Sequence, residues 1–291
     1  MSSLIQLKEV KKKIDHFTIG PFDFSIKPGV VTAIIGENGA GKSTLLKIIM
    51  DLVRHDEGDI IRFNNKTNWK EGVAYLPQTV IGYDGFTGTE LKELISYWYP
   101  NWDDTLFMEM IEQFQITLHE PYHKLSQGMQ QKLHLTLTIP RNTSLLILDE
   151  PTSFLDIPSK QFLFDVLIMC MEQSDRSILL ATHQADEVKK LADYLVLIKQ
   201  GTLLGKVEKD AIIERFRKYW FVDPVPFSSL PGEITRQHRE IISCNKEATE
   251  KFLYENGIPP LKSTTMELEE IMVLLLQYNT TSLPIYDLSS L

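Results

Sequence analysis

The residues best suited to chemistry follow the mostly apolar run Val30–Ile35. They have the spaced glycines, lysine and hydroxyl residues of a phosphate-binding loop, namely Gly36, Glu37, Asn38, Gly39, Ala40, Gly41, Lys42, Ser43 and Thr44. Glycine lets backbone N–H groups turn toward phosphate oxygens without steric cost, and a helix that begins there directs its positive dipole end at the anion. We expect Lys42 to contact the β- and γ-phosphates of a nucleotide and Ser43 to offer its hydroxyl to Mg²⁺.

Asp149 and Glu150 form a second candidate pair, because they end the apolar run Leu145–Leu148. If this run is a strand parallel to the first, Asp149 lies beside the phosphate loop and can hold Mg²⁺ directly or through water. Glu150 then faces an attacking water, as its general base or as the group that orients it. The alternative is an ordinary strand end with solvated acids, and the phosphate loop upstream favours the catalytic interpretation.

A Ser-x-Gly turn, from Ser126 to Gly128, precedes the helical run Gln130–Leu137. Backbone N–H groups at a helix N-terminus bind anions, so this turn is a further candidate phosphate site. Many helices begin in this way, and the turn is informative because it lies about twenty residues before Asp149.

Apolar runs that alternate with helical spacing must position these residues, and the alternation predicts an α/β sheet. The further strands that we expect are Leu4–Val10, Phe22–Ile26, Ile60–Phe63, Val73–Leu76, Ile178–Ala181 and Tyr194–Ile198. The helices that we expect are Thr44–Leu52, Glu90–Tyr99 and Asp103–Phe114. These elements predict a nucleotide-binding domain over residues 1–206, with a helical subdomain over about 84–140.

The composition changes after about Lys206. Beyond it we expect a strand over Ile234–Ser243 and helices over Glu247–Glu255 and Met266–Tyr278. Residues 207–291 therefore predict a small α+β accessory domain, either regulatory or enlarging a dimer contact.

Bulk properties exclude several classes of protein. The 291 residues are 43% hydrophobic and 24% charged, as in soluble globular proteins, and a net charge of −9 argues against a dedicated nucleic-acid binder. Two cysteines, Cys170 and Cys244, cannot form a disulfide framework or a zinc cluster. The N-terminus lacks a signal peptide's apolar run, and stretches such as Ile271–Leu276 are too short to cross a bilayer. We expect a soluble intracellular protein.

Taken together, the motifs resemble those of the ABC (ATP-binding cassette) ATPases. Leu125–Met129 is similar to the family's signature motif, Gln78 to its Q-loop glutamine, Ser153–Asp156 to its D-loop and His183 to its switch histidine. With the phosphate loop and the Asp149 strand, six motifs follow the family's order across residues 4–205. The resemblance implies a P-loop NTPase fold with a mostly parallel core sheet, an antiparallel β subdomain and a helical subdomain.

The same resemblance implies a mechanism that needs two cassettes, of one chain or of two different chains. They pack head to tail, and each ATP lies between the phosphate loop of one and the signature of the other. Ser126 and Gly128 would contact the partner's γ-phosphate, and Asp156 would act across the interface. Gln78 would join Mg²⁺ and the attacking water, and His183 would hold the γ-phosphate.

An aromatic residue near the N-terminus usually stacks on adenine in this family. Phe17 is the first candidate for this contact and His16 the second. Taken alone, Asp156 would be a helix cap and His183 a satisfied surface or core histidine, so only the joint order of the motifs supports their catalytic roles.

Three residues depart from the usual family motifs: Gln127 and Met129 in the signature and Phe154 in the D-loop. The signature run Leu125–Leu133 resembles the form in export-type and bacitracin- or lantibiotic-resistance-like cassettes. The segments Tyr97–Asp103 and Met266–Met272 resemble the Ytr-type ATPases of Gram-positive bacteria. The family resemblance implies polytopic membrane permease subunits as partners and a peripheral location on the cytoplasmic face of the membrane. The narrower resemblance implies an ABC-2-like membrane partner and a link to the cell-envelope response to antibiotics.

A soluble ABC ATPase that acts on nucleic acid or ribosomes is the alternative function. Ribosome-acting members carry two cassettes in one chain, and chromosome-organising members insert a long coiled coil where only the short segment between Gln78 and Leu125 lies here. A cassette that assists iron–sulfur assembly is a third alternative, without support from a cluster motif.

The aromatics Trp98, Tyr99, Trp102 and Phe107 suggest either a small helical core or a docking groove for a membrane partner.

Overall fold

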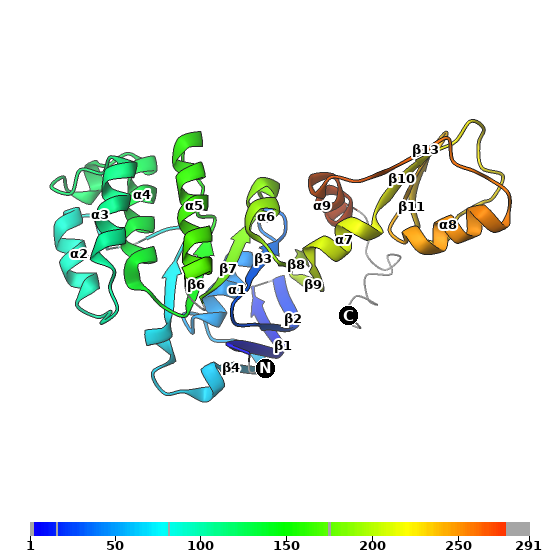
Figure 1. The fold of residues 1–291 in the computed structure, drawn as a ribbon. Coiled ribbons are helices and arrows are strands. Elements are labelled where there is room, and N and C mark those ends of the chain that lie inside the picture. The colour runs from blue at the N-terminus through cyan, green and yellow to red at the C-terminus, as the bar shows by residue number, and fades with distance from the viewer. Residues whose placement is uncertain (1–2, 16, 81, 174–175, 278–291) are drawn as a thin grey trace.

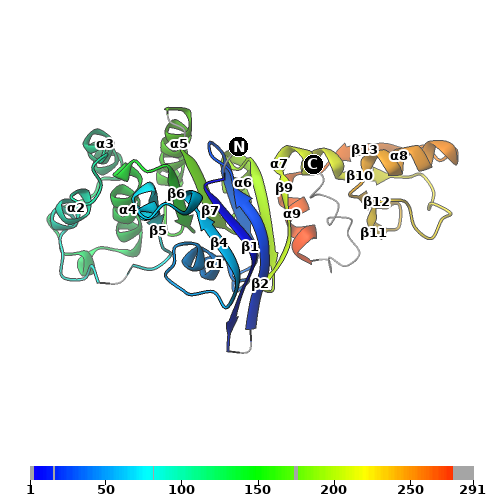
Figure 2. The ribbon, with the colours of Figure 1, turned by 90° about the horizontal axis from the view of Figure 1, so that it is seen from below.

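The computed structural model describes residues 3–15, 17–80, 82–173 and 176–277. Within them the strands form a six-stranded sheet, a three-stranded sheet and, near the C-terminus, a four-stranded sheet. Figure 1 shows a group of helices, α2 to α4, on one side of the six-stranded sheet and the C-terminal unit on the other. Figure 2 shows the same order of parts from below, with the three-stranded sheet between them.

The six-stranded sheet has the strand order β5-β6-β7-β3-β8-β9. Its strands are β3 (Val31–Ile35), β5 (Val73–Leu76), β6 (Leu145–Asp149), β7 (Ser177–Thr182), β8 (Tyr194–Lys199) and β9 (Thr202–Glu208). All neighbours are parallel except β9, which is antiparallel to β8. Every residue of β3, β6 and β7 is buried, which explains why their sequences are apolar on both faces. The predicted mostly parallel α/β core is confirmed.

The three-stranded sheet has the order β2-β1-β4 and is antiparallel. Its strands are β1 (Ile5–Ile14), β2 (Phe17–Ile26) and β4 (Glu57–Arg62). β1 and β2 are longer than the sequence predicts, because their pairing continues to Ile14 and Phe17. Helix α1 (Lys42–Ile49) shares one apolar cluster with β1, β2 and β3, and each of its fully buried Leu or Ile side chains contributes roughly 2 kcal/mol. This packing fixes the loop that precedes α1.

The helical group consists of α2 (Gly88–Ser96), α3 (Asp104–Phe114) and α4 (Gln127–Thr138). Each helix begins at a side chain that accepts a hydrogen bond from the first turn: Thr87 from the N–H of Glu90, Asp103 from that of Leu106, and Ser126 from that of Met129. The group shares its apolar core with α5 (Ile157–Gln173) and with one face of the large sheet.

The aromatic residues of the helical group differ in burial. Phe107 is buried, and Tyr99 and Trp102 pack against the same core. Trp98 and Tyr97 are 69% and 81% exposed, and their rings meet edge to face at 5.4 Å. The helical core therefore takes three of these aromatics, and an exposed pair remains at the end of α2.

The C-terminal unit contains a sheet of order β11-β12-β10-β13. Its elements are α7 (Lys209–Arg215), β10 (Arg217–Trp220), β11 (Glu233–Gln237), β12 (Glu240–Ser243), α8 (Lys246–Glu255), β13 (Lys262–Thr265) and α9 (Leu268–Gln277). The single strand predicted over Ile234–Ser243 is wrong, because the chain turns at His238, whose φ is +51°, and returns as a hairpin. Apolar spacing alone did not reveal this turn, which has neither glycine nor asparagine.

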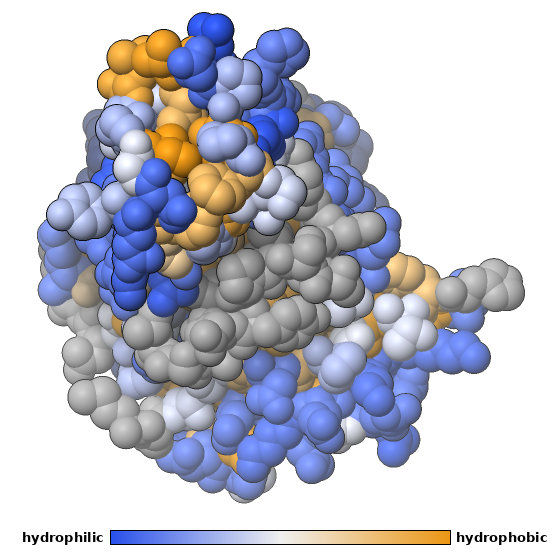
Figure 3. All heavy atoms as spheres, turned by 90° about the vertical axis from the view of Figure 1, so that its right-hand side faces the viewer, coloured by the Kyte–Doolittle hydropathy of each residue, from blue (hydrophilic) through white to orange (hydrophobic). Residues whose placement is uncertain are grey.

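One face of this sheet packs against α8 through Tyr219, Ile241 and Leu253. Helix α9 returns toward the six-stranded sheet and contacts α6 (Ala185–Leu191). Lys189 of α6 forms an ion pair of 2.9 Å with Glu267, the residue directly before α9. The predicted last residue of this helix, Tyr278, lies outside the described residues. Figure 3 turns the side of the C-terminal unit toward the viewer and shows apolar side chains gathered in the upper part of that view.

His134 is a buried histidine of α4. Its ring stacks on Tyr122 at 5.3 Å and meets the edge of Tyr83 at 5.9 Å. Its Nε2 has no hydrogen-bond partner among the residues that the structure describes. Burial lowers the pKa of His134 to about 4, so the folded chain holds a neutral ring at neutral pH.

We predict that His134 weakens the folded state in acid. The unfolded chain binds this proton near pH 6.5 and the folded chain only near pH 4, so stability falls as pH drops between these values. His134→Gln should remove roughly 2–3 kcal/mol of the stability lost between pH 7 and pH 4.5, measured by urea unfolding at both values. The exposed His119 provides the control His119→Gln, and an undiminished acid loss in His134→Gln would contradict the prediction.

Candidate functional site

The phosphate loop connects β3 to α1, and close packing forces glycine at two of its positions. A Cβ on Gly36 would lie 2.4 Å from the carbonyl oxygen of Ile198. Gly41 precedes α1 with a φ of +102°, and a Cβ there would lie 2.8 Å from the side chain of Ile19. The loop therefore keeps its backbone close to both sheets and its N–H groups at the start of a helix.

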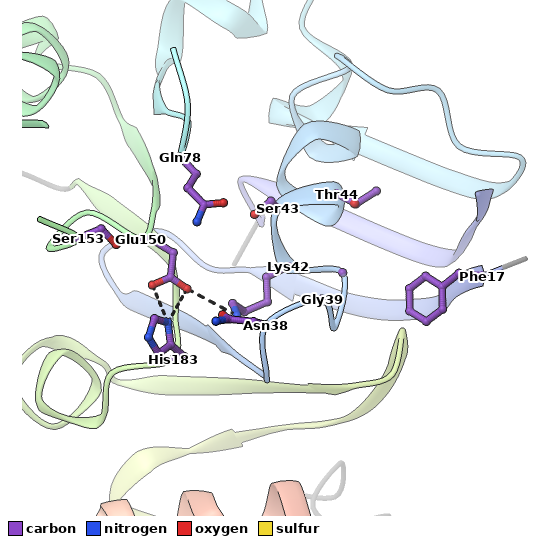
Figure 4. A pocket seen from close by; sticks show the side chains of 11 residues that line it. Phe17, Asn38, Gly39, Lys42, Ser43, Thr44, Gln78, Glu150, Ser153 and His183 are labelled. Carbon is purple, nitrogen blue, oxygen red and sulfur yellow. Dashed lines mark hydrogen bonds and ion pairs between the residues drawn. The ribbon is translucent and has the colours of Figure 1, made fainter. Parts of the chain in front are cut away.

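A pocket of about 320 Å³ opens above this loop, and Figure 4 shows its side chains. Its lining residues are Phe17, Asn38, Gly39, Gly41, Lys42, Ser43, Thr44, Gln78, Glu150, Ser153 and His183. They come from the start of β2, the phosphate loop, and the segments after β5, β6 and β7. The structure thus brings together most of the residues that the sequence singled out.

Lys42 is the buried cation of the pocket. Its Nζ donates hydrogen bonds to the carbonyl oxygens of Gly36, at 2.8 Å, and Glu37, at 3.3 Å. It also lies 3.6 Å from Oε1 of Glu150, and both side chains are almost fully buried. The ammonium group is therefore held inside the loop, where a phosphate would add a further anionic partner.

Asp149 is the last residue of β6, directly before Glu150, and lies beside the first turn of α1. Its Oδ1 accepts a hydrogen bond of 3.1 Å from the hydroxyl of Ser43. Its Oδ2 is buried and has no hydrogen-bond partner in the described part of the chain. Burial raises the pKa of Asp149, and the charge of Glu150 adds to this rise. A hard divalent cation such as Mg²⁺ prefers oxygen ligands of this kind and would satisfy the free oxygen.

Glu150 and His183 are in contact on one side of the pocket. Nδ1 of His183 lies 2.9 Å from Oε1 and 2.8 Å from Oε2 of Glu150, as the dashed lines in Figure 4 show. Glu150 has the left-handed φ of +52°, and its N–H donates to the carbonyl of Ala181 at 2.9 Å. Such backbone conformations are costly for a residue with a side chain and are concentrated at functional sites. The carboxylate is thus aimed into the pocket by the fold.

Phe17 closes the far side of the pocket from Glu150 and His183, as Figure 4 shows. Its ring is held against the turn between β8 and β9, because a Cβ on Gly201 would lie 2.9 Å from its Cζ. The side chain is 37% exposed, so one part of the ring stays available to a ligand. The second candidate, His16, lies outside the described residues.

The predicted signature and D-loop residues lie on the surface of the chain. Ser126 caps α4, and a Cβ on Gly128 would lie 3.0 Å from the carbonyl oxygen of Phe154. Asp156 accepts a hydrogen bond of 2.8 Å from the N–H of Ser159 and pairs with Lys132 at 3.3 Å. Ser126, Gly128 and Asp156 are not among the described residues that line the pocket. In one chain they form a separate, exposed surface.

The residues that surround Glu150 include three that the motifs did not single out as site residues. Ser153 lines the pocket, while Gln131 of α4 and Glu187 of α6 contact the segment directly after Glu150. The available signal was weak: both long side chains are buried polar residues of helices, and only the tertiary structure shows what they contact.

Comparison with known sequences identifies related proteins. A family described as "ABC transporter" matches residues 19–153. The ABC transporter ATP-binding protein YtrB of Bacillus subtilis (strain 168) is 24% identical over 220 residues, which are 74% of this chain and 75% of YtrB. The achromobactin transport ATP-binding protein CbrD of Dickeya dadantii (strain 3937) is 30% identical over 204 residues, which are 65% of this chain and 76% of CbrD.

Solved structures with a similar fold are also ATP-binding cassettes. An ATP-binding subunit of an ABC transporter matches with a TM-score of 0.66 and 24% identity, over 73% of this chain and 92% of that one. A dimeric cassette bound to ADP and Pi in a post-hydrolysis state matches with a TM-score of 0.60 and 20% identity, over 70% of this chain and 98% of that one. These identities establish a shared fold.

We predict that Lys42→Ala weakens nucleotide binding at least tenfold, because it removes the cation that the loop holds for phosphate. Titration of the purified chain with a fluorescent ATP analogue measures the Kd. The control is Lys47→Ala, which removes an exposed lysine of the same helix. An unchanged Kd in Lys42→Ala, with normal folding, would remove Lys42 from the phosphate site.

Proposed function

The chain belongs to the family of ABC transporter ATP-binding proteins, and from this premise we propose that it powers membrane-spanning subunits as one cassette of an ATP-closed dimer. As an ABC ATPase it binds and hydrolyses ATP. The observation that carries the proposal is that the candidate residues lie at two separate places on the chain. Lys42, Glu150 and His183 line the pocket, whereas the Ser126 turn lies on a separate exposed surface.

We propose that the pocket residues hold the triphosphate and its cation. Lys42 and the loop N–H groups bind the β- and γ-phosphates, and Phe17 stacks on the adenine. Ser43, Asp149 and Gln78 hold Mg²⁺, which neutralises phosphate charge when it is bound. The hydrogen bond between Ser43 and Asp149 supports this assignment, because it brings two oxygen ligands together before the ion arrives.

Glu150 and His183 are the proposed catalytic pair, with Gln78 orienting the water from the other side. Glu150 accepts a proton from the attacking water or orients it, and the contact with His183 at 2.8–2.9 Å fixes its carboxylate. His183 is half exposed and reaches toward the γ-phosphate. Burial of Glu150 beside Lys42 keeps the carboxylate out of bulk water, where it would be less effective.

A second cassette, either another copy or a different chain, completes the site in this proposal. It presents its own Ser126 and Gly128 turn to the γ-phosphate, and Asp156 acts across the interface. Two exposed apolar side chains beside Asp156 support a contact here: Phe154 is 65% exposed and Ile157 is 84% exposed. The dimeric cassette of similar fold supports this arrangement.

Membrane subunits are the proposed recipients of the motion. None of the helices in the described ranges is long and apolar enough to span a membrane. We propose that a polytopic permease docks on the helical group at the exposed pair Tyr97 and Trp98. The chain is then peripheral on the cytoplasmic face of the membrane.

The finer proposal is an export-type system linked to the response to antibiotics. It rests on the likeness to YtrB and on the Ytr-like segments Tyr97–Asp103 and Met266–Met272. Relatives named for uptake, such as the zinc uptake protein ZnuC of Bacillus subtilis (strain 168) at 27% identity, share a similar cassette, so the membrane subunits set the direction. Residues 207–291 are the proposed accessory domain, regulatory or enlarging the dimer contact.

The first prediction of this proposal concerns Glu150→Gln. The variant keeps the size of the side chain but loses the carboxylate that activates water, so steady-state ATPase activity should fall about a hundredfold or more. ATP binding should persist, and sedimentation should show an ATP-bound dimer that accumulates. The control Glu112→Gln changes an exposed residue of α3, and undiminished activity in Glu150→Gln would remove this residue from its role.

The second prediction concerns the exposed Ser126 turn. Ser126→Arg places a long cation where the partner's ATP must dock, so ATP-dependent dimerisation should be lost while each monomer still binds nucleotide. Thr105→Arg adds the same side chain at an exposed position of α3 and should dimerise normally. If sedimentation shows a normal ATP-bound dimer of Ser126→Arg, the signature assignment fails.

The third prediction concerns membrane docking. The double variant Tyr97→Ala/Trp98→Ala removes the exposed aromatic pair, so less of the chain should co-purify with membranes from the native cell. The ATPase activity of the purified chain should be unchanged. Tyr254→Ala, which removes an 88% exposed aromatic of the C-terminal unit, is the control. Full membrane recovery of the double variant would place the docking surface elsewhere.

A further inference from the structure

The turn that directly follows Glu150 is anchored by two buried polar side chains. Nε2 of Gln131, in α4, donates a hydrogen bond of 2.8 Å to the carbonyl oxygen of Pro151. The hydroxyl of Thr152 donates a hydrogen bond to Oε1 of Glu187, in α6. The two helices reach the turn from different sides, with α5 between them in Figure 1.

Both anchors are shielded from water. Thr152 is 1% exposed, Glu187 is fully buried and Gln131 is 6% exposed. Hydrogen bonds in such surroundings are strong, and the loss of one partner leaves the other unsatisfied. The conformation of Glu150 needs such support, because its φ of +52° is unfavourable for a residue with a side chain.

Burying the carboxyl group of Glu187 in a helix costs free energy. Burial raises the pKa of Glu187 to about 7, and the charges of Glu150 and Asp186 add to the rise, while the hydroxyls of Thr152 and Thr182 oppose it. An apolar residue of similar size would avoid this cost, so stability alone does not account for a carboxyl group here. Its hydrogen bond to Thr152 is the feature that an apolar residue would lack.

We propose that Glu187 is a positioning residue for Glu150. Through Thr152 it fixes the turn that holds the carboxylate in the pocket, and Gln131 fixes the same turn from the signature helix. The inference rests on the proposed catalytic role of Glu150. The hydrogen bond between Thr152 and Glu187 is a second contact between the segment after β6 and the segment after β7. The first is the contact between Glu150 and His183.

The position of Glu187 has a consequence for communication between the two halves of the dimer. Gln131 lies on the helix that begins with the Ser126 turn, and this turn is the part that binds the partner's ATP in the proposed function. A displacement of α4 would therefore shift Pro151 through its hydrogen bond to Gln131 and change the orientation of Glu150. The hydrogen bond between Thr152 and Glu187 would limit this shift.

The test compares Glu187→Leu, Thr152→Val and Glu187→Gln in the purified chain. The first two remove the hydrogen bond without leaving a large cavity, so kcat should fall about tenfold or more while the Kd for ATP stays close to wild type. The melting temperature should fall by only a few degrees, because each variant leaves one buried group unsatisfied. Glu187→Gln keeps an oxygen that accepts from Thr152 and should recover most of the kcat. The double variant Glu187→Leu/Thr152→Val should be no worse than Glu187→Leu alone, because both lack the hydrogen bond between positions 152 and 187.

The matched control is Thr136→Val. Thr136 is a fully buried threonine of α4 whose hydroxyl, among the described residues, donates a hydrogen bond within its own helix, to the carbonyl of Lys132 at 2.9 Å. It should keep normal kcat, which shows that loss of a buried hydroxyl is not enough to reduce activity.

Two results would overturn the inference. One is a normal kcat in Glu187→Leu. The other is a loss of kcat that is matched by lost ATP binding and lost thermal stability and is not recovered by Glu187→Gln, since this pattern indicates a purely structural role. The proposed function fails separately, if Glu150→Gln itself retains full activity.

Discussion

Three buried parallel strands must end at one edge of the sheet for the pocket to exist. β7 pairs in parallel with β3 on one side and with β6 on the other, and the register places Ile35 opposite Thr182 and Asp149 opposite Ala181. The chain after each strand therefore enters the same small space, which delivers the phosphate loop, the carboxylate Glu150 and the imidazole of His183. Ligands of open α/β sheets bind at such carboxyl ends for this reason.

Charge balance is the second condition that the fold meets. Lys42 and Glu150 are nearly inaccessible to water and lie 3.6 Å apart, so each offsets part of the cost of burying the other. The carboxylate of Asp149 keeps one oxygen without a partner in the described chain, and Ser43 approaches the other. A triphosphate with its cation would supply the missing opposite charges. The pocket thus holds its charged side chains in place before nucleotide arrives.

The sequence predicts the core strands and the pocket residues because both depend on local patterns. Val73–Leu76 is found as a strand with the predicted bounds, and the glycine spacing from Gly36 to Gly41 places the loop. The His238 hairpin was missed, because its turn uses residues without a strong turn preference. Gln131 and Glu187 were missed because a buried polar residue in a helix has no meaning until its partner, distant in the sequence, is known. The assigned site roles stay predictions.

The central claim is that a complete ATP site consists of the phosphate loop of one cassette and the Ser126 turn of another. The most direct test mixes two inactive variants of this chain, Lys42→Ala and Ser126→Arg, and measures ATPase activity. In a mixed dimer one site has an intact phosphate loop and an intact partner turn, so equal mixing should restore about a quarter of wild-type activity. If mixed dimers form but stay inactive although the wild-type chain alone hydrolyses ATP, the composite site is contradicted.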